Sequence, residues 1–131
     1  QTRYDLVSFP VYHFWGDFRH YRVDHWWHPA RARTACLHRR QKNRSYHWAP
    51  RPLHCGRFPQ EAYLTPRLNS GIRLLHLGYA GLGERQAKYR RYLDLDPQGK
   101  YCPLNHYRSI LDPYPSLKRW TGENVEALLW N

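Results

Sequence analysis

The sequence is poor in acidic residues, contains no methionine and has no long apolar run. Only 10 of its 131 residues are Asp or Glu, against 21 Lys and Arg, so the net charge is +11. A positive field of this strength favours an anionic partner such as nucleic acid, lipid headgroups or a phosphorylated small molecule. The alternative is a solvated basic surface that only keeps the protein soluble. No apolar run approaches the ~20 residues of a membrane span, and no signal-peptide pattern opens the chain.

Cysteine is also scarce. The three cysteines have no CxxC spacing, which is more typical of reduced thiols in a cytoplasmic protein than of a disulfide framework. A zinc site is an alternative, because each cysteine has a histidine nearby: Cys36 with His38, His54 with Cys55, and Cys102 with His106. None of these pairs has the knuckle spacing of a structural zinc site.

The residues that are abundant predict a folded domain with short elements. Hydrophobic residues make up 41% of the chain and aromatic residues 16%, which is enough to bury a core in one unit covering residues 1–131. The 10 prolines and 8 glycines predict many loops. Strand patterns come first and helical patterns follow, so the expected fold class is α+β, with short antiparallel or mixed strands followed by two or three helices.

Strands are expected mainly in the first half of the chain. Residues 4–15 are rich in Val, Phe and Tyr, with Pro10 indicating an edge or a bulge, and residues 19–24 can return antiparallel after the Gly16-Asp17 turn. Further strands are expected over 33–39, 45–48 and 72–77, while 60–71 is expected to be loop. In the strand 72–77, Ile72, Leu74 and His76 share one face.

Helices are expected in the second half. Leu82, Tyr89 and Leu93 form an apolar stripe opposed by basic residues, and the turn residues at 96–99 end that helix. A second stripe begins at Pro103 and ends before Asp112-Pro113, and a short helix is expected over about 123–129.

The chemistry-bearing candidates are few. Composition alone favours a stand-alone basic nucleic-acid-binding module, but no recognisable nucleic-acid motif is present. His54 lies between proline-rich turns, and His76 ends a strand before a glycine-rich loop, so either imidazole can bind a divalent metal or serve as a packed structural residue. The only Asp-x-Asp, Asp94-Leu95-Asp96, precedes a proline turn and is expected to form that turn.

Several segments in order resemble a known family. YDLVSFPVYHFWGDFRHYRVDHWWHP, LHRR, PLHCGRFP, IRLLHLGYAGLGERQAKYRRYLDLDP and HYRSILDPYPSLKRW are similar to the C-terminal half of bacterial family-2 glycosyltransferases. The resemblance covers nearly the whole chain, and the run from His76 to Tyr92 is its most specific part. It implies part of a GT-A fold that transfers a sugar from a nucleotide-sugar to a glycan or surface-polymer acceptor, with Mg²⁺ or Mn²⁺ neutralising the diphosphate.

The resemblance also implies roles for particular residues. Arg39, His54 and His76 are expected at the donor diphosphate, with His54 the first candidate to approach the metal. A carboxylate near the acceptor is needed as general base, which implies Asp17 or Asp24. Stacking on the acceptor sugar is assigned to three tryptophans, Trp15, Trp26 and Trp27.

One part of the family pattern is missing from the sequence. Such enzymes bind the nucleotide and metal through an N-terminal half with its own Asp-x-Asp motif, and this chain has no such half. We therefore expect the chain to be the acceptor-side part of a longer enzyme and to be inactive alone. Its expected location is the cytoplasm or the inner membrane surface.

Overall fold

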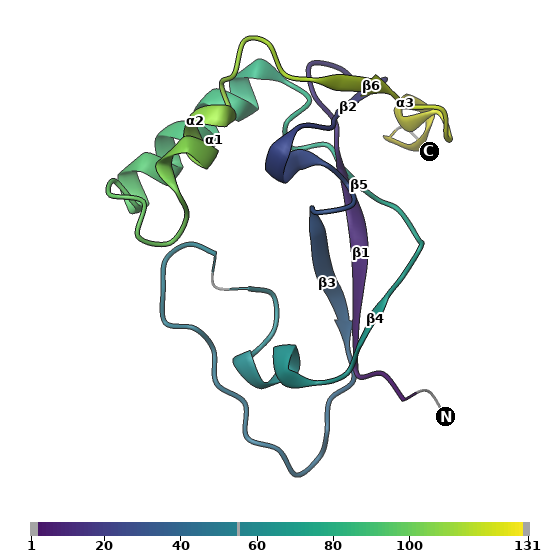
Figure 1. Ribbon diagram of the computed structural model, residues 1–131, viewed down its shortest axis with the longest axis vertical. Coiled ribbons are helices and arrows are strands. Elements are labelled where there is room, and N and C mark those ends of the chain that lie inside the picture. Colours follow the sequence, from purple (N-terminus) through teal and green to yellow (C-terminus); the bar gives the residue numbers. More distant parts are fainter. Residues whose placement is uncertain (1–2, 55, 130–131) are drawn as a thin grey trace.

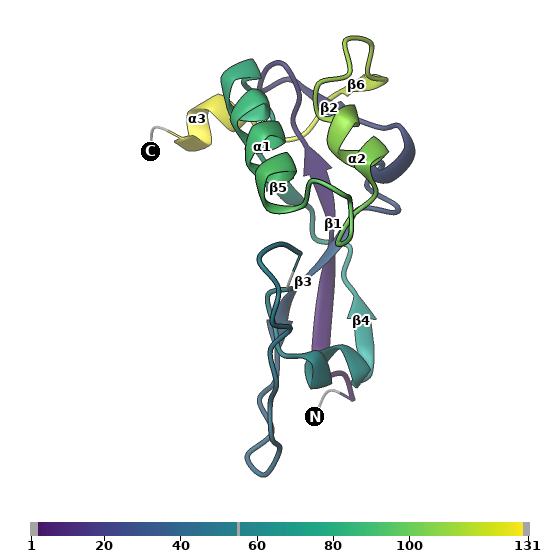
Figure 2. The same ribbon diagram turned by 90° about the vertical axis from the view of Figure 1, so that its left-hand side faces the viewer.

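Strand β1 (Leu6–His13) is the element on which the rest of the chain is assembled. A computed structural model describes residues 3–54 and 56–129, and Cys55 with the expectations placed on it lies outside these ranges. β1 lies along the middle of the molecule (Figures 1 and 2). It connects a lower part, with β3 and β4, to an upper part, with β5 and the helices. The described residues form a small α+β domain, as the sequence predicts.

The sheet around β1 is mixed. β3 (Arg33–His38) pairs with it antiparallel, while β4 (Arg67–Asn69) pairs parallel with residues 6–8 and β5 (Leu74–His76) parallel with residues 11–13. The register against β3 shifts between Val7 and Ser8, where Cys36 of β3 is left out of the pairing, so the irregularity lies before Pro10, which itself pairs in register with Arg33. Pro10 itself lies between the stretches paired with β4 and β5, so its missing N–H leaves neither partner without a donor. This gap explains how proline is accommodated in a central strand.

The expected return of residues 19–24 against the first strand is only partly correct. β2 (His20–Arg22) touches the end of β1 through a single antiparallel bridge, Phe14 to Tyr21. Its main partner is β6 (Leu117–Arg119), a strand that the sequence analysis missed, and the two form a separate antiparallel ribbon. A single turn of 3₁₀ helix, η1 (His25–Trp27), follows β2.

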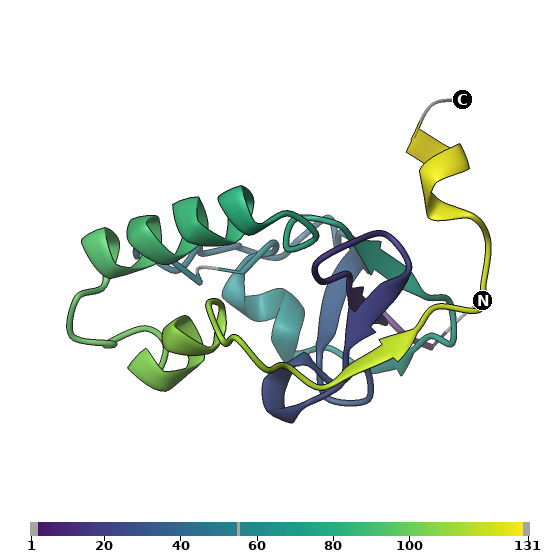
Figure 3. The ribbon, with the colours of Figure 1, turned by 90° about the horizontal axis from the view of Figure 1, so that it is seen from above.

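The three helices lie within the ranges that the sequence predicts. α1 (Leu82–Leu95) and α2 (Leu104–Ser109) lie together on one side of β1, and α3 (Val125–Leu129) lies on the other (Figures 1 and 3). α1 packs Tyr89 and Tyr92 against the largest core cluster, whereas Leu82 at its start stays 56% exposed. None of the described helices is long and apolar enough to cross a membrane.

Two expectations for the middle of the chain are wrong. The described residues between 39 and 59 form a long segment without helix or strand, so the strand expected over 45–48 is absent. Residues 60–71, expected to be loop, contain the 3₁₀ helix η2 (Gln60–Leu64) and β4. Ala62 of η2 is fully buried against Leu6 and Ala35, and this packing gives a short polar segment its structure.

The turn between α1 and α2 is built on one buried carboxylate. Asp96 accepts hydrogen bonds from the backbone N–H groups of Lys100, Tyr101 and Cys102 at 2.6, 2.9 and 3.2 Å. The hydroxyl of Tyr107 on α2 donates to the same carboxylate at 2.8 Å. The turn-forming role expected for Asp96 is therefore confirmed. Its neighbour in the Asp-x-Asp sequence, Asp94, is exposed.

We expect Asp96→Ala to lower the melting temperature by several degrees, because four donors lose their acceptor and one of them, Tyr107, is fully buried. Asp94→Ala is the matched control and should melt close to wild type. Thermal unfolding followed by circular dichroism measures both. Equal melting temperatures for the two variants would contradict a structural role for Asp96.

Candidate active site at the ends of strands β1 and β5

Two histidines meet where two parallel strands end. His13 is the last residue of β1 and His76 the last of β5, and the strand register places them side by side. Their ring centroids are 4.9 Å apart. Ligands of sheets with parallel strands bind at the carboxyl ends of the strands, so this pair lies at the position where a site is expected. The carboxyl-edge position predicted for His76 is confirmed.

Aromatic rings enclose the histidine pair. His13 contacts Trp27 edge-on at 5.1 Å between centroids, and both histidines lie close to Tyr79, at 5.5 and 5.2 Å. On the other side of Trp27, His106 from α2 stacks on the indole at 4.9 Å. The result is a continuous cluster of His13, Trp27, His76, Tyr79 and His106, here called the histidine cluster.

The histidine cluster holds three unsatisfied nitrogens. The Nδ1 atoms of His13, His76 and His106 are buried and have no hydrogen-bond partner among the described residues. Buried polar atoms are nearly always paired in native structures, so three exceptions in one cluster call for an explanation, of which a ligand is one.

Burial keeps these imidazoles neutral. It lowers the pKa of His13 to about 3, with nearby His76, Lys88 and His106 acting in the same direction. Burial also lowers the pKa of His76 and of His106, and in each case nearby basic groups add to it. At neutral pH the three rings are uncharged, and each has one nitrogen that accepts and one that donates.

A lysine supplies the positive charge of the site. The ammonium of Lys88, on α1, lies 4.0 Å from the centroid of the Tyr79 ring and makes no salt bridge in the described part of the chain. Burial, followed by the nearby Arg91, lowers its pKa. A side chain at position 78 would collide with the Lys88 ammonium and crowd His76. Gly78 therefore creates the space that lets Lys88 approach the histidine pair.

A set of hydrogen-bonded polar side chains, which links His54, Tyr107 and Asp96, lies beside the histidine cluster. The Nε2 of His54 is 3.2 Å from the hydroxyl of Tyr107, which donates its own proton to Asp96. His54 must therefore be the donor to Tyr107 through Nε2, which leaves its Nδ1 as the nitrogen with a free lone pair. His54 also has a positive φ of 53°, an uncommon backbone conformation for a residue other than glycine.

The structure separates the three tryptophans expected to stack on the acceptor. Trp15 and Trp27 are each 2% exposed and belong to the core, so protein atoms cover their rings. Trp26 is 44% exposed, and its ring lies edge-on to His106 at 5.2 Å between centroids. Of the three, only Trp26 presents a face to solvent next to the histidine cluster.

The two candidate bases and Arg39 make contacts of their own. Asp17 is exposed, and its carboxylate accepts from the backbone N–H groups of Arg19 and His20, each at 2.8 Å, and contacts the His20 ring. Asp24 accepts from Arg22 at 2.7 Å and from the backbone N–H of Ser116 at 2.8 Å. Arg39 lies at the other end of the sheet, 3.7 Å from Asp5. The carboxylates of Asp17 and Asp24 form no hydrogen bond with a side chain of the histidine cluster within the described residues, although the backbone oxygen of Asp24 accepts from the N–H of Trp27 at 2.9 Å.

The described residues do not form a Mg²⁺ or Mn²⁺ site by themselves. In the part of the chain that the structure describes, no group of three or more His, Cys, Asp or Glu side chains is arranged to hold a metal ion. This covers Cys36 with His38 and Cys102 with His106, whereas the pair of His54 with Cys55 lies partly outside the described residues. These ions prefer carboxylate and other oxygen ligands. The histidine cluster offers imidazoles, with the Lys88 cation beside them, so a divalent ion needs carboxylates from elsewhere.

The sequence analysis did not identify His13 or Lys88 as site residues, and it considered His106 only as a zinc ligand paired with Cys102. His13 lies in an aromatic segment whose side chains are expected to pack in the core. Lys88 lies on the basic face of a helix, which is expected to face solvent. Only the parallel pairing of β1 with β5 identifies His13 as the partner of His76. The glycine at position 78 was a local signal for close approach, but the sequence does not say which side chain approaches.

We expect the stability of the protein to fall as the pH drops below about 6.5. The unfolded chain protonates His13 near 6.5, whereas the folded protein keeps it neutral down to about 3. This one group therefore contributes a loss of up to about 1.4 kcal/mol per pH unit between these values. His13→Phe should make the free energy of unfolding depend less on pH. The substitution breaks no hydrogen bond at Nδ1, because the Nδ1 of His13 has no partner among the described residues. Urea unfolding between about pH 7 and about pH 4.5 measures this dependence.

His25→Asn is the control for that measurement, since His25 is exposed and asparagine tolerates its positive φ of 40°. It should keep the wild-type slope. If His13→Phe also kept that slope, His13 would not be held neutral by burial.

Comparisons with known proteins identify no relative. No protein-family model, no curated protein and no solved structure matches this chain.

Proposed function

We propose that this chain is the acceptor-side part of a glycosyltransferase that moves a sugar from a nucleotide-sugar to a glycan or surface-polymer acceptor. The observation that carries the proposal is the meeting of His13, His76 and Lys88 at the carboxyl ends of two parallel strands. The enzyme is expected to work in the cytoplasm or at the inner membrane surface, and this chain alone to be inactive.

The chemistry of the cluster suits a diphosphate leaving group. Negative charge develops on the diphosphate as the bond to the sugar breaks, and positive groups placed there beforehand stabilise it. Lys88 supplies a partly desolvated cation that forms no salt bridge within the described residues, although the Glu84 carboxylate one turn earlier on α1 is near enough to act on its pKa. The neutral imidazole of His76 can donate one hydrogen bond to a phosphate oxygen. His54 has a free Nδ1 lone pair and remains the first candidate for approaching a metal.

The residues proposed to contact the acceptor are chosen by the exposure of their side chains. Trp26 is the tryptophan proposed to stack on the acceptor sugar, because Trp15 and Trp27 are buried. Asp17 is proposed ahead of Asp24 as the general base, because Asp17 is exposed whereas the Asp24 carboxylate is paired with the buried guanidinium of Arg22. The Asp17 carboxylate also accepts from the backbone N–H groups of Arg19 and His20. Mg²⁺ or Mn²⁺, if used, would neutralise the diphosphate, and its carboxylate ligands would come from outside this chain.

A stand-alone nucleic-acid-binding module is the second candidate. Aromatic and basic side chains alternate on the segment after β3, where His38, Arg40, Tyr46 and Trp48 line a surface hollow of about 370 Å³. Trp48 is 60% exposed. Exposed aromatic rings beside arginines are the composition of single-strand binding surfaces.

The first test is binding of inorganic pyrophosphate and of uridine diphosphate to this chain, followed by the intrinsic fluorescence of its tryptophans or by calorimetry. We expect Lys88→Met to weaken binding by about tenfold or more, because a charge-assisted contact is lost. Lys100→Met removes the same charge from an exposed position and should leave binding unchanged. Equal weakening in both variants would indicate a diffuse field and contradict a site at Lys88.

A nucleic-acid-binding module would give a different result in the same binding measurements. Generic oligonucleotides would bind at micromolar concentration, with an affinity that falls steeply as salt rises. Such binding, unaffected by Lys88→Met and lost with Trp48→Ala, would favour the module over the enzyme.

The second test is transfer activity in the native gene product. If it carries an upstream nucleotide-binding half, we expect sugar transfer, and His76→Asn or Asp17→Asn should each reduce its rate by about 100-fold or more. His25→Asn is the control on an exposed histidine. Full activity in both site variants would show the residue assignment to be wrong even where transfer is observed.

A further inference from the structure

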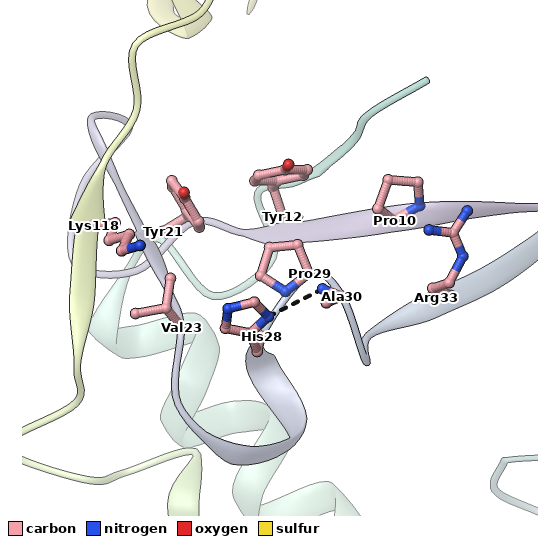
Figure 4. Close-up of a pocket in the computed structure, with 9 residues that line it drawn as sticks. All are labelled: Pro10, Tyr12, Tyr21, Val23, His28, Pro29, Ala30, Arg33 and Lys118. Carbon is pink, nitrogen blue, oxygen red and sulfur yellow. Dashed lines mark hydrogen bonds between the residues drawn. The ribbon is translucent and has the colours of Figure 1, made fainter. Parts of the chain in front are cut away.

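A separate cavity lies on the opposite face of β1 from the histidine cluster. Adjacent residues of a strand point to opposite faces, so Pro10 and Tyr12 face away from His13. They line a cavity of about 300 Å³ whose walls come from β1, β2, β3, β6 and the segment after η1. Figure 4 shows its lining residues: Pro10, Tyr12, Tyr21, Val23, His28, Pro29, Ala30, Arg33 and Lys118.

The walls combine an apolar floor with two phenols. The rings of Tyr12 and Tyr21 meet edge-on with centroids 4.9 Å apart, and Val23, Pro29 and Ala30 complete the apolar part. Burial, with Tyr12 nearby, raises the pKa of the Tyr21 hydroxyl, so that it stays protonated and available as a donor.

His28 is fixed as a hydrogen-bond donor toward the cavity. Its Nδ1 accepts the backbone N–H of Ala30 at 3.1 Å, so the neutral ring must carry its proton on Nε2. In Figure 4 this second nitrogen points away from Ala30, toward the side of the cavity that Val23 and Lys118 form.

Two cations line the cavity without a carboxylate. Lys118 is the cross-strand partner of Tyr21 and so shares its face of the ribbon, and its ammonium points toward the space between Tyr21 and His28 (Figure 4). Within the described residues it forms no salt bridge. Arg33 donates through Nη2 to the backbone oxygens of Ser8 and Ser70, at 3.1 and 2.6 Å. None of the described residues that line the cavity carries a carboxylate.

We propose that this cavity binds a small organic anion of about one sugar ring in size, held by its phosphate or carboxylate group against Lys118 and His28. The ring of the ligand would lie on the apolar floor beside Tyr12 and Tyr21. None of the described residues that line the cavity is acidic, so the ligand would supply the negative charge that Lys118 and Arg33 attract. The proposal is independent of the glycosyltransferase proposal, because the two sites lie on opposite faces of β1.

The experiment titrates this chain with glucose 6-phosphate, glucuronate, inorganic phosphate and glucose, and follows the side-chain NMR signals of His28 and of the Trp120 indole beside Tyr21. We expect one or both anionic sugars to bind and shift these signals, with glucose at least about tenfold weaker. The preferred sugar anion shows whether the group recognised is phosphate or carboxylate. Inorganic phosphate should bind more weakly than glucose 6-phosphate, because it makes no contact with the floor.

A pair of neighbouring variants separates a built site from general attraction. Lys118→Gln and Arg119→Gln remove the same charge at adjacent exposed positions on opposite faces of β6. Lys118→Gln should weaken binding at least about fivefold and Arg119→Gln should not. Tyr21→Phe, which removes only a hydroxyl, should also weaken it. Equal weakening by the two charge variants, or equal binding of glucose and glucose 6-phosphate, would overturn the proposal. Neither result depends on Lys88 or on transfer activity.

Discussion

The buried guanidinium of Arg22 is the interaction that holds the two ends of the chain together. It is 1% exposed, and it donates to Asp24 at 2.7 Å, to Asp112 at 2.8 Å and to the backbone oxygen of Ser109 at 2.5 Å. It also lies over the Trp15 ring at 4.5 Å. A buried cation costs several kcal/mol to desolvate, and removing one partner of such a network typically costs about 3–5 kcal/mol. β2, η1 and the end of α2 are therefore constrained to one arrangement.

That arrangement determines where the candidate site forms. Arg22 packs under Trp15 and Trp27, and Trp27 in turn contacts His13 on one side and His106 on the other. The Trp27 indole is also anchored by a hydrogen bond to Ser109 at 3.0 Å. The histidine cluster is thus built on a rigid aromatic and ionic base, and rigid support is what a site needs to hold polar groups in a low-dielectric position. The flexible part of the site is Lys88, whose long side chain reaches in over Gly78.

β1 separates two environments of different chemistry. On the face of His13 the groups are neutral imidazoles and one lysine, enclosed by aromatic rings. On the face of Tyr12 they are phenols, a fixed histidine donor and two cations, around a cavity. Because side chains alternate along a strand, one short segment serves both faces. The net charge of +11 is therefore distributed over distinct basic surfaces and is not concentrated in a tail.

The sequence by itself determined the local elements whose pattern is periodic: the strand over 33–38, the helix from Leu82, the Asp96 turn and the strand that ends at His76. It determined these because propensity, apolar period and turn chemistry act over a few residues. Only the tertiary structure decided that β2 pairs with β6, that His13 meets His76, and that Trp15 and Trp27 are core while Trp26 is exposed. These depend on contacts between segments far apart in the chain, through register and burial, which no local pattern encodes.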